Sequence, residues 1–154
     1  MRDVPSLLSM LGQPDQARLV IMPWSYIRMR RQAARLTIAQ AARPLWVRPE
    51  HQFDVEQHFR DLETEGFRVQ RLYRTEGLTY FFSHDVYHQL TNLPPHQHPR
   101  LCGRCGWDQH STQYDHDGAD VRWSDEDPGI CTRCEQDIAW EAARTRSKGH
   151  RHAA

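Results

Sequence analysis

The sequence predicts an α+β fold built from two small units, and three observations support this prediction. Segments with helix caps and prolines at their ends fill residues 25–65. An aromatic-rich stretch with an alternating start and a glycine-containing turn follows at 67–82 and is typical of a β-hairpin. Two matched cysteine pairs then stand in the last third of the chain. The length of 154 residues allows one domain or two small ones.

Three helices are predicted in the first unit, over residues 25–35, 38–43 and 49–65. Thr37 is a good N-cap for the second helix, because its hydroxyl can accept a hydrogen bond from the first turn. Pro49 suits the first turn of the third helix, where a missing N–H costs little. These signals predict helices separated by short turns.

A β-hairpin, a short helix and a linker follow. The hairpin turns at 75–77, and the helix covers 85–90. Residues 94–100 contain three prolines, which favours a stiff, extended connection. The predicted organisation is therefore a first unit at 1–93, a linker at 94–100, a cysteine-containing unit at 101–147 and a loose tail at 148–154.

The cysteine pairs are Cys102 with Cys105 and Cys131 with Cys134, and 25 residues separate the pairs. Two CxxC loops at this spacing are typical of a tetrahedral structural zinc site. Four thiolates fill the coordination shell, so no position remains for a catalytic water. The sequence therefore predicts one structural Zn²⁺ ion.

Disulfides and redox chemistry are the alternative roles for these cysteines. The first residues do not read as a secretory signal peptide, and neither CxxC pair has the setting of a thioredoxin-like unit. Reduced, metal-binding thiols favour the cytoplasm. No stretch approaches the roughly 20 apolar residues of a membrane span, so no membrane partner is expected.

The order of elements in the second unit is a knuckle at 102–106, a predicted hairpin at 107–123 and a helix that opens with the second cysteine pair. This order resembles the treble-clef zinc finger over about residues 101–147. The resemblance implies a metal-dependent fold and identifies no single family.

Residues 25–82 resemble a winged helix-turn-helix domain in two phrases. The end of a recognition helix leading into a wing resembles residues 59–67, FRDLETEGF. The start of a phage-repressor helix-turn-helix motif resembles residues 27–37, IRMRRQAARLT. The resemblance implies DNA binding, with the recognition helix in the major groove. The chain differs from the usual helix-turn-helix pattern in two ways. Trp46 stands where a turn glycine is usual, and the predicted helix at 49–65 contains six acidic residues.

Charge is unevenly distributed along a chain whose formal net charge is zero. Residues 1–48 contain eight arginines and two acids, whereas the rest is acidic. If DNA is bound, arginines neutralise its phosphates. The alternative is that the arginines pair with the acidic helix inside the fold. The candidate DNA contacts are Arg28, Arg30, Arg31, Arg35, Arg43, Arg48, Arg68, Arg71 and Arg74.

Three functions remain open at this stage. The first is a non-enzymatic DNA-binding regulator, possible in a phage or mobile element. The second is an adaptor or inhibitor that binds a host protein through the acidic residues 50–65 and the tryptophan-bearing finger. The third is a nuclease of the His-Asn-His group, suggested by Asp115-His116-Asp117 between the cysteine pairs, although no asparagine follows His116. No phosphate-binding glycine loop or nucleophile elbow is present, so no small-molecule substrate is expected.

Several histidines could form a second metal site. His84 and His88 have helical spacing, and His96 and His98 precede the first cysteine. Because four cysteines already complete a zinc site, the sequence favours surface and linker positions for these imidazoles.

Overall fold

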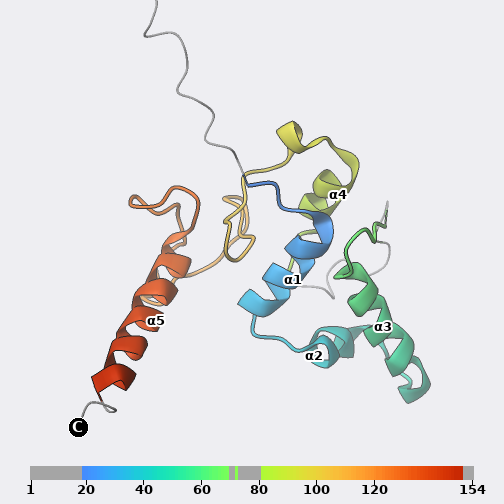
Figure 1. The fold of residues 1–154 in the computed structure, drawn as a ribbon. Helices are drawn as coiled ribbons and strands as arrows, with labels where there is room; N and C mark the ends of the chain where they lie inside the picture. Colours follow the sequence, from blue (N-terminus) through green and yellow to red (C-terminus); the bar gives the residue numbers. More distant parts are fainter. Residues whose placement is uncertain (1–18, 70–71, 73–80, 151–154) are drawn as a thin grey trace, which may run out of the picture.

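The computed structural model describes residues 19–69, 72 and 81–150 of the chain (Figure 1). Within these ranges, α-helices and single 3₁₀ turns are connected by loops. The helices are α1 Pro23–Ala33, α2 Ile38–Ala42, α3 Gln52–Leu62, α4 His84–Asn92 and α5 Thr132–His150, and the 3₁₀ turns are Arg43–Leu45, Pro49–His51 and Pro95–Gln97.

The predicted α+β class is wrong, because the described residues contain no β-strand. Most of the predicted wing, residues 70–71 and 73–80, lies outside the described residues. At its described end, Phe81 and Phe82 are both buried, at 4% and 8% exposure. Consecutive residues in a strand point to opposite faces, so burial of both neighbours fits a packed loop better than an edge hairpin.

The second predicted hairpin, at 107–123, is a loop with one isolated bridge between Tyr114 and Asp120. Its turn is held by the Asp115 carboxylate, which accepts hydrogen bonds from the backbone N–H groups of Asp117 and Ala119 at 2.9 and 3.0 Å. Such side-chain bonds take the place of a strand ladder. A second isolated bridge joins Trp123 to Cys131.

The predicted helices are confirmed within a few residues at each end. Thr37 caps α2 as expected: its Oγ1 accepts from the Gln40 N–H at 3.2 Å, and the Gln40 side chain accepts from the Thr37 N–H at 2.8 Å. This reciprocal pair is a capping box, which satisfies two backbone donors at once. Ser83 caps α4 in a similar way by accepting from the Val86 N–H.

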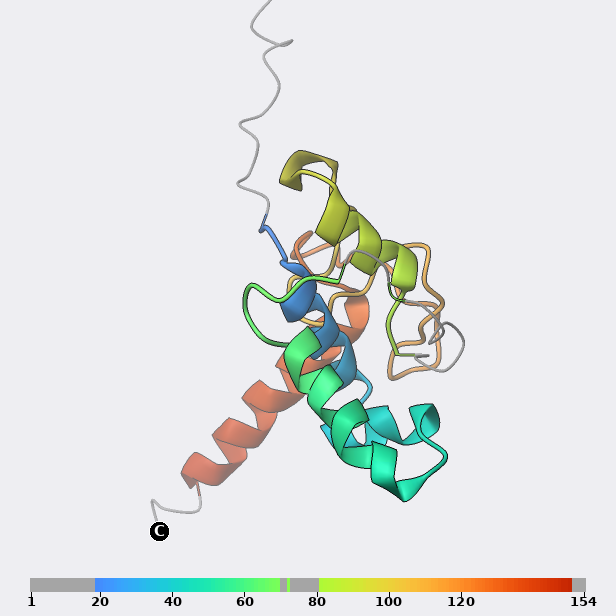
Figure 2. The ribbon, with the colours of Figure 1, turned by 90° about the vertical axis from the view of Figure 1, so that its right-hand side faces the viewer.

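Helix α1 forms the centre of the larger core and packs against both α3 and α4 (Figure 2). Tyr26 and Ile27 of α1 are almost fully buried, as are Phe59 of α3 and Tyr87 and Leu90 of α4. Helix α5 starts beside this body, and its C-terminal end extends away from it in both ribbon views (Figures 1 and 2).

Tyr26 joins α1 to the start of α4. Its phenol oxygen accepts the Ser83 N–H at 2.9 Å, and the side chain is 1% exposed. Burial raises the pKa of Tyr26 from its ordinary value of 10.0 to about 12. The neutral phenol is therefore part of the folded state.

Tyr26→Phe is expected to lower the free energy of unfolding by about 1–2 kcal/mol, because the partly buried Ser83 N–H loses its acceptor. Since the folded pKa lies above the unfolded one, the parent also loses stability as pH rises from 10 through about 12. The variant should lack that alkaline loss. Urea unfolding at pH 7 and pH 11 measures both effects. Tyr114→Phe is the control, because Tyr114 is 58% exposed, and an equal effect there would contradict the assignment.

Candidate metal centre

The four cysteines lie together in the structure, as their spacing predicts. Sγ of Cys102 is 3.7 Å from Sγ of Cys134, and Sγ of Cys105 is 3.7 Å from Sγ of Cys131. All four sulfurs lie within 4.8 Å of one another, and all four residues are buried. A tetrahedral thiolate site with bonds of about 2.3 Å has sulfur–sulfur edges of about 3.8 Å. The arrangement could therefore hold one metal ion.

The first cysteine loop is a tight turn that needs glycine. Gly106 has a φ of 71°, in the left-handed region, and its N–H donates to the Cys102 carbonyl at 2.9 Å. A Cβ atom at Gly106 would lie 3.2 Å from atoms of both Tyr26 and Arg30. The turn thus brings the metal loop close to the side of α1.

The second cysteine pair stands at the start of α5, and backbone hydrogen bonds fix it to the first loop. The Gly103 N–H donates to the Gly129 carbonyl at 2.9 Å, and the Cys131 N–H points to Sγ of Cys102 at 3.4 Å. Because Cys134 lies on the first turns of α5, a metal ion bound here anchors the N-terminal end of that helix.

The cluster has the chemistry of a cation site. Hydrogen bonds from Cys105, Cys131 and Cys134 lower the pKa of Cys102, and hydrogen bonding to Cys102 raises the pKa of Cys134. Four buried thiolates at this distance repel one another unless a cation neutralises them. The donor set is therefore suited to a thiophilic divalent ion.

The core around this centre is small. Its buried members are the four cysteines together with Trp107 and Val121. The Trp107 ring lies 5.2 Å from that of Trp123, and the Arg100 guanidinium lies 3.7 Å above the Trp123 ring. Few apolar groups other than the ligands are thus available to hold the segment together.

Arg30 links the metal loop to the helical body. Its Nε donates to the Phe81 carbonyl at 3.2 Å, and its Nη1 donates to the Cys105 carbonyl at 3.2 Å and to Oε1 of Gln113 at 3.0 Å. We predicted Arg30 as a DNA contact from sequence. No local sequence signal indicates this bridging role, because its partners lie 51 to 83 residues away.

Arg28 and Arg31 lie against Glu63, just beyond α3. Arg31 makes a two-pronged pair with the Glu63 carboxylate at 2.5 and 2.7 Å, and Arg28 donates to the Glu63 carbonyl at 2.6 Å. The Glu63 and Arg31 side chains are only 8% and 14% exposed. Arg31 is therefore paired inside the fold, as the alternative interpretation expects, whereas the side chain of Arg28 is 50% exposed.

The other candidate arginines have different surroundings. Arg43 lies 4.3 Å from the Trp46 ring centre, and Arg68 lies 5.6 Å from that of Trp24. Arg48 is 74% exposed and 3.9 Å from Glu50. Arg35 is exposed at the end of α1. Arg71 and Arg74 lie outside the described residues.

The histidines do not gather into a second metal site in the described part of the chain, where the cysteine cluster is the group of ligands close enough to hold an ion. Nε2 of His88 accepts the Leu72 N–H at 3.0 Å, and Nε2 of His98 lies 2.8 Å from the Leu93 carbonyl. The His84 ring stacks on Phe82 at 5.1 Å, and Nε2 of His96 lies 3.3 Å from the Gln97 amide.

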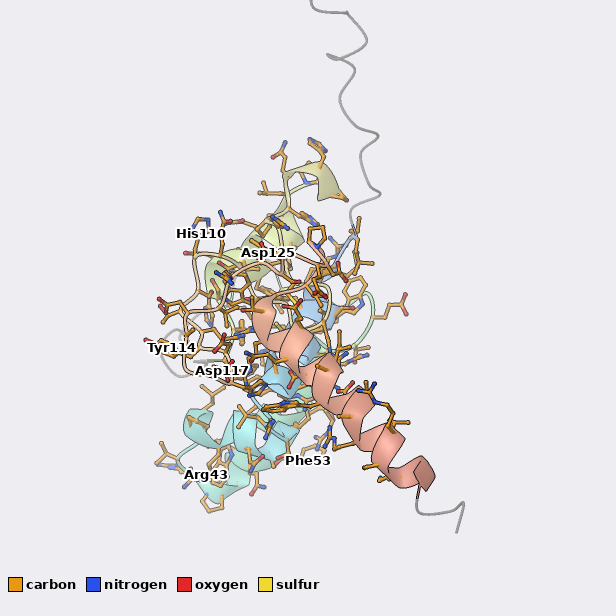
Figure 3. The ribbon with its side chains drawn as sticks, turned by 90° about the vertical axis from the view of Figure 1, so that its left-hand side faces the viewer. Arg43, Phe53, His110, Tyr114, Asp117 and Asp125 are labelled. Carbon is orange, nitrogen blue, oxygen red and sulfur yellow. The ribbon has the colours of Figure 1, made fainter. Side chains whose placement is uncertain are left out.

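His116, the residue that suggested nuclease chemistry, is attached to α5. Its Nε2 lies 2.8 Å from Oδ1 of Asp137, and its ring packs 4.4 Å from the Trp140 ring. Figure 3 shows the neighbouring Tyr114 and Asp117 on the loop beside α5. These contacts give His116 a role in joining loop and helix.

Comparison of the chain with protein-family models, with curated proteins and with solved structures gives no match. Among the described helices, none combines the length and apolar character needed to cross a bilayer.

Proposed function

We propose that the four cysteines hold one Zn²⁺ ion in a treble-clef-like module, and that the chain is a non-enzymatic DNA-binding regulator. The zinc assignment is supported by the all-sulfur donor set and by the 3.7 Å sulfur–sulfur distances. A closed four-thiolate shell suits a structural ion.

The basic half of α5 carries the DNA-binding proposal. Residues 142–148 are all exposed and contain Arg144, Arg146 and Lys148 but no acid. Arg144 and Lys148 are four residues apart, so they share one helix face with the half-exposed Trp140. A cationic helix anchored at one end by a metal centre can lie along the phosphates of a duplex.

This proposal changes the expected DNA contacts. Arg28, Arg30 and Arg31 have internal partners, so they contribute less than the sequence alone suggests. The exposed Arg35, Arg43 and Arg48 remain candidate contacts in addition to the basic half of α5.

The test is binding of the full zinc-loaded chain to a random-sequence duplex at two salt concentrations. The affinity should fall steeply with salt, and Arg144→Gln/Lys148→Gln should reduce the log–log slope by about 2, or about 1 for each lost phosphate contact. Arg60→Gln is the control, because Arg60 lies on the acidic α3 and pairs with Glu56. A parent chain that binds no duplex at low salt would rule out the DNA proposal.

An adaptor function is the second candidate, favoured by two exposed apolar side chains near α3. Val47 is 93% exposed and Phe53 is 70% exposed, with Glu50 and Asp54 close in sequence. Apolar side chains of this kind are common at protein interfaces. Two results together would favour this function over DNA binding. The chain would bind no duplex, and Phe53→Ser, but not Tyr114→Ser, would lose binding to a host protein.

A further inference from the structure

A pocket of about 260 Å³ lies between α1, the first cysteine loop and α5. Three arginines line it, namely Arg35 just after α1, Arg104 of the loop and Arg133 of α5, together with Gln113 and Asp137. Two metal ligands, Cys105 and Cys134, form part of its wall. The pocket thus lies beside the metal centre, in a space to which three cationic side chains contribute.

The acids near this pocket already have partners. Asp137 lies 2.8 Å from Nε2 of His116, and Glu141 pairs with Arg104 at 2.5 Å. Arg35 and Arg133 have no acidic partner among the described residues. The pocket therefore contains guanidinium groups with unused hydrogen-bonding capacity.

The metal centre itself affects this charge balance. Four thiolates and one dication leave two negative charges, and Arg30 and Arg133 lie beside the two cysteine loops, where they can offset them. Arg35 makes no ion pair with any described residue, and the one carboxylate in the pocket lining, that of Asp137, faces His116.

The backbone of Arg35 supports a ligand role. Its φ is 57°, in the left-handed region, and it follows α1 in a turn closed by the Leu36 N–H on the Arg31 carbonyl at 3.1 Å. Glycine is the favoured residue at this kind of helix end. Arginine is less stable than glycine in this backbone conformation. Its presence here, with the side chain at a pocket, indicates that the side chain binds a ligand.

Gln113 adds a neutral donor. Its Oε1 is taken by Arg30, whereas its Nε2 is buried and has no hydrogen-bond partner among the described residues. A buried amide N–H without an acceptor is costly, and a ligand oxygen in the adjoining pocket would satisfy it.

We propose that this pocket binds one phosphate group, with Arg35 and Arg133 as charged donors and Gln113 as a neutral donor. Guanidinium groups suit phosphate because their parallel N–H bonds match its oxygens. This inference rests in part on the proposed function, because one source of the phosphate group is the backbone of a bound duplex. The other source is free inorganic phosphate.

Arg35→Gly is the decisive variant, since glycine is suited to the backbone conformation and only the side chain is lost. The parent, Arg35→Gly and the control Arg60→Gln are each titrated with a random-sequence duplex and, separately, with inorganic phosphate. We expect Arg35→Gly to melt no lower than the parent, to show a duplex salt slope smaller by about 1, and to lose any phosphate binding that the parent shows.

The two titrations distinguish duplex phosphate from free phosphate as the ligand. They also distinguish failure of the pocket proposal from failure of the DNA-binding proposal. Duplex binding that weakens in Arg35→Gly, without binding of free phosphate, assigns the pocket to the DNA backbone. Phosphate binding without duplex binding keeps the pocket and removes the DNA function. Duplex binding that is unchanged in Arg35→Gly keeps the DNA function and overturns the pocket. A parent that binds neither probe overturns both.

Discussion

Cys134→Ser is expected to abolish metal binding and to unfold the segment from the first cysteine loop through α5. The reason is the small size of the surrounding core, in which Trp107 and Val121 are the buried members besides the four ligands. A structural zinc ion in a small module contributes an apparent stabilisation of about 10–16 kcal/mol, which so few apolar contacts cannot replace. Most of the helical signal of α5, the longest helix described, should be lost.

Far-UV circular dichroism and amide NMR spectra measure this loss, and a chelator should reproduce it in the parent chain. Adding Zn²⁺ back should restore the parent but not Cys134→Ser. The helices around Tyr26 and Phe59 should largely retain their structure, because they belong to a separate buried cluster. A variant that keeps α5 helical and its thiols buried without metal would contradict the proposed scaffold.

Glu63→Gln is expected to destabilise the helical body by about 3–5 kcal/mol. The substitution keeps the shape of the side chain but leaves the guanidinium of Arg31, only 14% exposed, without its counter-charge. The hydrogen bond from Arg31 to Glu63 also raises the pKa of Arg31, which is consistent with a close pair. Loss of one partner of a buried pair is costly because the other charge stays buried.

Urea unfolding followed by circular dichroism tests this expectation, with Glu50→Gln as the matched control. Glu50 also lies near an arginine, Arg48, but the two side chains are 64% and 74% exposed, so its loss should change stability little. Equal effects of the two substitutions would show that the Glu63 pair does not act as a buried contact.

The sequence predicts those features of this protein that depend on short spacing. The cysteine cluster follows from two CxxC loops, and the start of α2 follows from Thr37 and Gln40 three residues apart. The local backbone determines the relative positions of the two cysteines within each loop and of Thr37 and Gln40. The meeting of the two loops, 32 residues apart at Cys102 and Cys134, follows from the need of one ion for four ligands.

Features that depend on distant residues were not predictable in the same way. Arg30 has partners at Phe81, Cys105 and Gln113, and the Arg31–Glu63 pair spans 32 residues. The α+β prediction was wrong because turn and aromatic patterns in the sequence were interpreted as strands. In the loop at 107–123, Asp115 holds the turn with its own side chain, so only an isolated bridge forms.

The most direct test of the account is the metal content and ligand shell of the purified 154-residue chain. Elemental analysis combined with X-ray absorption at the zinc edge should give one zinc per chain, bound by four sulfur atoms at about 2.3 Å. A folded chain without metal, or an ion with fewer than four sulfur ligands, would contradict the claim that Cys102, Cys105, Cys131 and Cys134 form a closed structural site.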